Sequence, residues 1–278
     1  MSNFSLSFNL VGNSAKFASL AKILQEIQKG TLLLVGPEGV GKFTFVKNFL
    51  SFNKNGELII FSQPAGNKFY SIDTARMIVS LSRQATLKKF FLINDFHKFT
   101  KESQNTLLKT LEDIQNNNIF IFITHSFYSI LPTIRSRCLI LRFNLVSKKE
   151  MDDFLATTID QTKIKNKTNK QLINFLLKIY PGQPGKIHTA WQQKNKIMLL
   201  LKFLKASKID KIQMIDSLKK NFSLKELSEY FILLAKDRLL SDDLSDQEIE
   251  SYYKVFDLFL YNDLNFDVQL ANLVLNYG

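Results

Sequence analysis

The chain has 278 residues, with 37 Lys and Arg against 25 Asp and Glu, so its formal net charge is +12. A single cysteine excludes an internal disulfide framework and any cysteine-rich zinc module. No apolar run reaches the roughly 18 residues of a membrane-spanning helix, and the first ten residues lack the basic start of a signal peptide, so we expect a soluble, cytoplasmic protein.

Strands and helices alternate in the first half of the chain. Short apolar runs predict strands, and segments with one apolar face predict helices. The expected helices are residues 17–28, 41–52, 72–81 and 100–114, the last with Thr100 as its N-cap. The expected strands are residues 31–35, 58–61, 90–93, 119–124 and 139–143. Apolar strands between helices are typical of a parallel sheet covered on both faces, so the predicted fold class is α/β.

The strand signal stops after about residue 145. Short helices are expected at residues 148–159, 170–180 and 185–191, with a polar loop at residues 161–169. From residue 194 onward only helical periodicity is visible, with a polar break at residues 241–245. We therefore predict an α/β domain at residues 1–145, a small helical domain at residues 146–192 and a C-terminal helical domain at residues 193–278.

The charge is distributed unevenly along the chain. Residues 1–145 carry a net charge of +9, residues 146–220 carry +10 and residues 221–278 carry −7. A basic body with an acidic end could bind a polyanion through one part and a basic partner through the other. The alternative is a codon bias toward Lys, Asn, Ile and Phe, which would leave most lysines on solvated helix faces.

A glycine-rich turn follows the first predicted strand and opens a helix. Residues 36–42 read Gly-Pro-Glu-Gly-Val-Gly-Lys, and the positions expected to hold phosphate are Gly36, Gly39, Gly41 and Lys42. Phe43 stands where a Ser or Thr should hold Mg²⁺. Thr44 comes one position late, which turns its hydroxyl by about 100° around the helix. Two interpretations stay open: weak or unproductive ATP binding, or a turn that no longer binds nucleotide.

A second defect follows the predicted strand at residues 90–93. In a working site an Asp-Glu pair at this place would hold the metal and activate water. The pair here is Asn94 and Asp95, and Asn lacks the anionic oxygen that Mg²⁺ prefers, while Asp is shorter than Glu. Together with Phe43, these changes fall in one metal-phosphate site and predict that hydrolysis has been lost.

Three further segments carry a family resemblance. They are residues 71–76, Ser-Ile-Asp-Thr-Ala-Arg; residues 105–113, Asn-Thr-Leu-Leu-Lys-Thr-Leu-Glu-Asp; and residues 131–138, Leu-Pro-Thr-Ile-Arg-Ser-Arg-Cys. They closely resemble the bacterial clamp-loader branch of the AAA+ ATPases, whose Ser-Arg-Cys hallmark matches Ser136, Arg137 and Cys138. Residues 265–275 are similar to the last helix of that family's oligomerising collar. The resemblance therefore spans nearly the whole chain.

The resemblance implies an AAA+ P-loop domain, a small helical lid domain and an all-α collar. It implies a role in DNA replication, in the sliding-clamp loader of the DNA polymerase III holoenzyme, at the nucleoid in the cytoplasm. The implied partners are the gamma/tau motor subunits, the delta subunit, the sliding clamp and primed DNA, and no membrane. The defective site points to the stator-type member, which has no ATPase activity of its own.

The resemblance also gives roles to single residues. Arg137 would be an arginine finger, donated in trans to the ATP site of a neighbouring motor subunit, where a planar guanidinium can bridge phosphate oxygens. The alternative is an ion pair at the start of a strand, which we expect for Arg135 and Arg142. Thr124 stands at the first γ-phosphate sensor, although a strand-end hydroxyl bonded to backbone fits equally well. Gly185 stands where motor subunits carry the arginine of the second sensor.

The remaining reactive side chains are expected to be structural. Cys138 would be a small buried hydrophobe. His97, His125 and His188 show no metal-ligand spacing, so we expect surface or core positions for them. Residues 44–70 contain no cysteine, unlike relatives with a four-cysteine zinc module, so neither zinc nor another metal is expected. No cofactor is expected, apart from weak or unproductive ATP binding.

Two other functions stay open from the sequence. The first is an active, gamma/tau-like motor ATPase that tolerates an altered site, and Mg²⁺-dependent ATP turnover by the isolated chain would indicate it. The second is a free-standing DNA-binding AAA+ protein that uses the basic body, and salt-sensitive DNA affinity without other subunits would indicate that.

Overall fold

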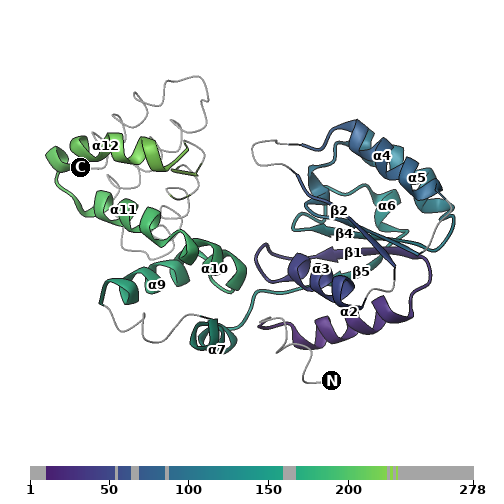
Figure 1. Cartoon of the computed structure of the whole chain (residues 1–278), viewed down its shortest axis with the longest axis horizontal. Coiled ribbons are helices and arrows are strands. Elements are labelled where there is room, and N and C mark those ends of the chain that lie inside the picture. Colours follow the sequence, from purple (N-terminus) through teal and green to yellow (C-terminus); the bar gives the residue numbers. More distant parts are fainter. Residues whose placement is uncertain are drawn as a thin grey trace. The chain divides into compact units, whose positions relative to one another are not determined.

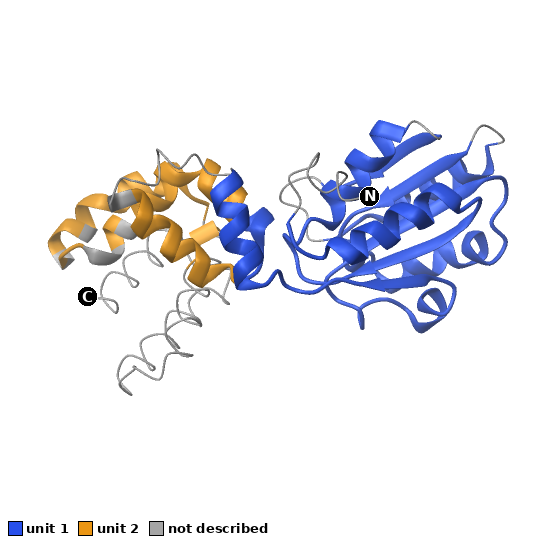
Figure 2. Cartoon of the chain, turned by 90° about the horizontal axis from the view of Figure 1, so that it is seen from below, with its two compact units in different colours: residues 1–161, 182–186 blue, residues 162–181, 187–278 orange. Residues whose placement is uncertain are grey.

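The computed structural model describes residues 11–53, 56–63, 69–84, 88–158, 167–223, 226–227 and 230. The chain divides into two compact units (Figure 2). One unit comprises Met1–Gln161 with Gly182–Lys186, and the other comprises Thr162–Pro181 with Ile187–Gly278. The expected division into three domains stays a prediction.

The first unit contains a five-stranded sheet in which every pair of neighbours is parallel (Figure 1). Its strands are β1 (Gly30–Val35), β2 (Glu57–Phe61), β3 (Lys89–Ile93), β4 (Asn118–Thr124) and β5 (Leu139–Arg142). Their order is β2-β3-β4-β1-β5, so β2 and β5 are the edges. Because parallel strands end on the same side, the carboxyl ends of β1, β3 and β4 lie next to one another.

Helices cover both faces of this sheet (Figure 1). One face carries α2 (Ser14–Glu26) and α3 (Lys42–Asn53), and the other carries α4 (Ile72–Arg83), α5 (Lys101–Glu112) and α6 (Pro132–Arg135). Successive strand residues point to opposite faces, so in β1 Leu32 and Leu34 enter one core while Leu33 and Val35 enter the other. The predicted α/β class with a covered parallel sheet is confirmed.

Most element bounds agree with the sequence predictions to within three residues. The hydroxyl of Thr100 accepts from the Ser103 N–H at 3.2 Å, so Thr100 is the N-cap of α5 as expected. Two short elements were not predicted: the 3₁₀ turn η1 (Phe96–Lys98) and α6. Each is shorter than two helical turns, so neither has room for an apolar period.

Helices follow the sheet domain. They are α7 (Lys148–Thr158), α9 (Lys167–Ile179), α10 (Pro184–Gln192), α11 (Lys194–Lys205) and α12 (Lys208–Asn221). Residues 167–169 belong to α9, so the predicted loop at residues 161–169 was wrong at its end. The first turn of a helix tolerates polar residues, which hid this start. The polar break at 241–245 and the collar-like segment at 265–275 lie outside the described residues.

Gln104 in α5 holds the loop that leads into α6. Its Nε2 donates to the carbonyl oxygens of Phe99 and Ser129, both at 3.0 Å, and its Oε1 accepts from the Leu131 N–H at 2.9 Å. The side chain is only 1% exposed. Buried polar groups of this kind fix a single arrangement when all their partners are satisfied. Gln104 therefore positions the chain just before Ser136, Arg137 and Cys138.

Replacing Gln104 by Leu should lower the free energy of unfolding by about 1–3 kcal/mol, because the buried backbone partners lose their hydrogen bonds. Urea denaturation followed by circular dichroism measures this. Asn105→Ala changes an exposed neighbour on the same helix and should cost much less. Equal stability of the two variants would contradict the assigned role of Gln104.

Candidate functional site

The predicted phosphate loop lies at the carboxyl edge of the central strands. Gly36 follows β1, Asn94 and Asp95 follow β3, and Thr124 is the last residue of β4. Val35 pairs with Thr124, and Ile93 pairs with Phe122 two residues earlier on β4. The structure thus brings the loop, the Asn94-Asp95 pair and the Thr124 position to one place, as their strand-end positions predicted.

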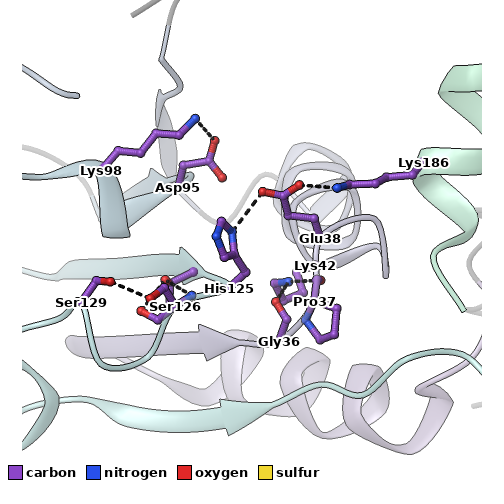
Figure 3. Close-up of polar contacts among 11 residues, drawn as sticks. Gly36, Pro37, Glu38, Lys42, Asp95, Lys98, His125, Ser126, Ser129 and Lys186 are labelled. Atoms are coloured by element: carbon purple, nitrogen blue, oxygen red, sulfur yellow. Dashed lines mark hydrogen bonds and ion pairs between the residues drawn. The ribbon is translucent and has the colours of Figure 1, made fainter. Parts of the chain in front are cut away.

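Lys42 is buried and bonded to its own loop (Figure 3). Its Nζ donates to the carbonyl oxygens of Gly36 and Pro37, both at 2.6 Å, and the residue is 5% exposed. Burial lowers the pKa of Lys42 to about 8, against the opposing effect of the Glu38 and Asp95 carboxylates. The Lys42 side chain thus fills its hydrogen bonds with carbonyl oxygens of the loop that carries it.

The two positions after Lys42 point to different surroundings. Phe43 packs against the core formed by α2, α3 and the sheet. Thr44 is exposed, one position further along α3. Position 43 therefore supplies a hydrophobic ring to the core instead of an oxygen to a metal.

The residues after β3 and β4 are bonded within the protein. The carbonyl oxygen of Asn94 accepts from the Tyr70 hydroxyl at 2.9 Å. Asp95 has a left-handed backbone (φ 50°), and its Oδ2 lies 3.1 Å from the Lys98 Nζ. The Thr124 hydroxyl donates to the Ser126 carbonyl oxygen and accepts from the Ser126 N–H. These contacts match the strand-end hydroxyl that was one of two interpretations of Thr124.

Glu38 lies inside the loop and makes two contacts that the sequence analysis did not predict (Figure 3). Its Oε1 lies 3.0 Å from the His125 Nδ1, and its Oε2 lies 2.7 Å from the Lys186 Nζ. The hydrogen bond from His125 holds the pKa of Glu38 well below its usual range; burial opposes this, and Lys186 lowers it further. An acidic residue inside an expected phosphate site was the signal that could have drawn attention to it.

Two of the three histidines lie together beside this loop. The rings of His97 and His125 have centroids 3.9 Å apart. Burial, followed by the neighbouring His125, lowers the pKa of His97 to about 4, while Asp95 opposes the shift. His97 is partly buried and His125 is exposed, which agrees with the expected surface or core positions. The contact between their rings was not predicted, because spacing along the chain does not show which strand ends meet. His188 is exposed on α10 and lies against Gln192.

Residues 182–186 belong to the same unit as the loop and contact it directly. The Gly185 N–H donates to the Gly39 carbonyl oxygen at 2.7 Å. Gly39 has a φ of +75°, and a Cβ there would lie 3.0 Å from both the N and the Cγ of Lys186. The expected second-sensor position, Gly185, thus contributes backbone only, and Lys186 brings the cation to Glu38.

Arg137 lies just after α6 and is held by two oxygens. Its Nη2 lies 2.6 Å from the Glu112 Oε1, and its Nη1 donates to the Thr133 carbonyl oxygen at 2.6 Å. The side chain remains 33% exposed. Ser136 bonds the same Thr133 carbonyl through its hydroxyl at 3.0 Å. The guanidinium is therefore oriented within its own chain while keeping access to solvent.

Arg135 and Arg142 lie beside Phe127. Their guanidinium carbons lie 4.6 and 4.4 Å from the centroid of the Phe127 ring, so both contact an aromatic face. The ion pairs expected for these two arginines stay a prediction, since the contacts described here are with an aromatic ring. Phe127 offers a flat apolar face on which a guanidinium stacks well. Among the described residues, Arg137 pairs with the Glu112 carboxylate.

Cys138 is partly buried. Its thiol donates to the Ile134 carbonyl oxygen, with 3.1 Å between sulfur and oxygen. Burial raises the pKa of the Cys138 thiol to about 12. A thiol of this kind is not ionised at neutral pH, so it is neither a nucleophile nor a ready metal ligand.

Within the part of the chain that the structure describes, no group of three or more His, Cys, Asp or Glu side chains is arranged to hold a metal ion. None of the described helices is long and apolar enough to span a lipid bilayer.

The chain was compared with known proteins, and its matches include subunits of DNA polymerase III. A family model described as "DNA polymerase III, delta subunit" matches residues 53–147. The DNA polymerase III subunit delta' of Buchnera aphidicola is 30% identical over 110 residues, which cover 38% of this chain and 33% of that protein. The DNA polymerase III subunit gamma of the same organism is 32% identical over 147 residues, covering 44% of this chain and 40% of that protein.

Over these segments the chain is similar to clamp-loader subunits of the AAA+ class. The aligned segments span less than half of these two relatives. In fold, the chain resembles a gamma subunit-related protein of Thermotoga maritima, with a TM-score of 0.61, 17% identity, and coverage of 94% of this chain and 98% of that one. These matches confirm the resemblance to clamp-loader proteins seen in the sequence, and the gamma and delta' matches are of similar strength.

The raised pKa of Cys138 predicts slow thiol chemistry. At pH 8 the folded chain should react with Ellman's reagent at least ~100-fold more slowly than the same chain in guanidinium chloride, because the thiolate is the reacting form. The absorbance of the released thionitrobenzoate measures both rates, and the single cysteine makes the signal unambiguous. A folded-state rate near that of the unfolded chain would contradict a buried, protonated thiol.

Proposed function

We propose that this chain is a delta-prime-like stator subunit of the sliding-clamp loader of a bacterial DNA polymerase III holoenzyme. It does not hydrolyse ATP itself, and it donates Arg137 in trans to the ATP site of a neighbouring motor subunit during DNA replication. Its partners are gamma/tau motor subunits, the delta subunit, and the sliding clamp with primed DNA within the complex. We place its activity at the nucleoid.

The observation that carries this proposal is the packing of Phe43. A P-loop ATPase places a hydroxyl at this position to hold Mg²⁺, which neutralises charge on the phosphates. Here the side chain at that position contacts the core. The amide of Asn94 in place of a carboxylate agrees with this, so we expect no metal or other cofactor, and ATP binding that is weak or unproductive.

The contacts of Arg137 support its proposed role in trans. The ion pair with Glu112 and the bond to the Thr133 carbonyl hold the guanidinium in one orientation. A polyphosphate of a neighbouring subunit carries more negative charge than Glu112 and can accept two parallel hydrogen bonds from a guanidinium. Glu112 would thus keep the finger extended until the neighbour's nucleotide takes over part of its contacts.

We assign the parts of the chain in the same way. Residues 1–145 are the AAA+ P-loop-like domain, residues 146–192 the small helical lid domain, and residues 193–278 the helical collar that assembles with other subunits. The covered parallel sheet supports the first assignment, and α11 and α12 lie in the proposed collar.

Substitution of Arg137 by Ala should lower the DNA- and clamp-stimulated ATPase rate of a reconstituted loader while folding and assembly are kept. Removal of an arginine finger costs roughly 10³-fold or more at the site that uses it, whereas the other ATP sites of the loader keep theirs. Steady-state phosphate release and gel filtration measure the two properties.

Arg135→Ala is the matched control, because it removes a neighbouring arginine that contacts an aromatic ring. It should leave the ATPase rate near that of the wild type. An Arg137→Ala loader with unchanged rate and full incorporation would count against the finger.

The gamma-type motor is the second candidate, favoured by the 32% identity to the Buchnera gamma subunit. The isolated chain separates the two. As a stator it should show no Mg²⁺-dependent ATP turnover above a buffer blank in a coupled phosphate assay. Turnover that disappears in the Lys42→Ala variant would favour the motor.

A further inference from the structure

The phosphate loop already holds an anion of its own. The two oxygens of the Glu38 carboxylate are divided between two cationic or polar partners, His125 Nδ1 at 3.0 Å and Lys186 Nζ at 2.7 Å. These partners come from separate segments: His125 follows β4, and Lys186 is in the first turn of α10. Figure 3 shows the carboxylate lying between them, above the loop that carries Lys42.

The three segments joined here are those that should contact a bound phosphate. The loop carries the P-loop lysine, His125 follows Thr124 at the expected first sensor, and Lys186 follows Gly185 at the expected second sensor. The Glu38 carboxylate, an anion like phosphate, bridges the last two segments through His125 and Lys186. The contact between the Gly185 N–H and the Gly39 carbonyl oxygen, 2.7 Å, adds a direct bond between segment and loop.

We propose that the Glu38 carboxylate is the built-in anion of this degenerate site, occupying the place of a phosphate group between His125 and Lys186, so that a polyphosphate binds tightly only when this carboxylate is neutralised. The inference rests on the proposed function, because it explains how a stator holds its phosphate loop without nucleotide.

The charged groups around the loop agree with a Glu38 carboxylate in the place of a phosphate group. Among the described residues near the loop, Lys42 bonds two loop carbonyls through its Nζ, and Lys186 pairs with Glu38. Asp95 is paired with Lys98 of its own turn. The Glu38 pKa, held well below its usual range, keeps the carboxylate charged at neutral pH.

An incoming polyphosphate must therefore displace Glu38 from both partners and would then lie beside a displaced carboxylate. Like charges in close contact oppose binding. If the charge of Glu38 is removed without loss of side-chain volume, this repulsion of polyphosphate disappears. In such a variant, His125 and Lys186 no longer face the Glu38 carboxylate, so a polyphosphate can take the place of that carboxylate beside them.

The test is the full chain with Glu38→Gln, which keeps the shape and removes the charge. Isothermal titration calorimetry with inorganic tripolyphosphate, without Mg²⁺, measures the affinity. We expect Glu38→Gln to bind at least ~10-fold more tightly than the wild type. Adding Lys186→Met to Glu38→Gln should remove most of this gain, since it deletes the cation that pairs with Glu38 in the wild type.

Glu57→Gln is the matched control. It makes the same change of net charge at an exposed position. Glu57 begins β2, so it lies at the amino ends of the parallel strands, whereas the phosphate loop lies at their carboxyl ends. It should bind tripolyphosphate as the wild type does. A similar gain in Glu57→Gln would assign the effect to net charge and overturn the proposal.

Two other results overturn it. One is a folded Glu38→Gln variant, with the wild-type melting temperature, that gains no affinity. The other needs no variant: wild-type protein that already binds tripolyphosphate with micromolar affinity would have no anion blocking its site.

The stator role is tested separately by incorporation into a loader with motor and delta subunits. A gain of tripolyphosphate binding by a chain that does not assemble counts against the stator role alone. Normal assembly by a Glu38→Gln variant without that gain counts against the role of Glu38 alone.

Discussion

The parallel pairing of β3, β4 and β1 is the constraint on which the rest of the first unit depends. Because all three strands run the same way, their carboxyl ends lie at one edge, and the residues that follow them meet there. This strand pairing brings together the glycine-rich loop, the Asn94-Asp95 pair and Thr124-His125. The phenylalanine-rich cores on the two faces hold that edge rigid, for example through Phe96 stacked on Phe122 with centroids 3.9 Å apart.

At that edge the protein satisfies its charges internally. Lys42 bonds the carbonyls of its own loop, Asp95 pairs with Lys98, and Glu38 joins His125 to Lys186. A site prepared for a ligand usually leaves such groups for the ligand to satisfy. Here these contacts hold the loop and the 182–186 segment together. Arg137 is paired as well, with Glu112, but its side chain stays 33% exposed.

The sequence predicts the layers of the fold because apolar runs and amphipathic periods are local properties. It predicts the loop, the defect at Phe43 and the Ser136-Arg137-Cys138 segment for the same reason, since each is a short stretch of residues. The missed features all depend on contacts between distant segments. Glu38 finds partners 87 and 148 residues away, at His125 and Lys186. The contact of Arg135 and Arg142 with Phe127, and the three bonds of Gln104, likewise appear only when the loops are folded against each other.

The packing of Phe43 couples the residue at this loop position to the stability of the sheet domain. A single codon change to a hydroxyl residue would bring back an oxygen, but it would also remove an aromatic ring from the packing around α2 and α3. Large-to-small changes in packed regions generally cost stability. A hydroxyl residue at position 43 would therefore come at the expense of packing, so the core as well as the loop constrains which residue stands here.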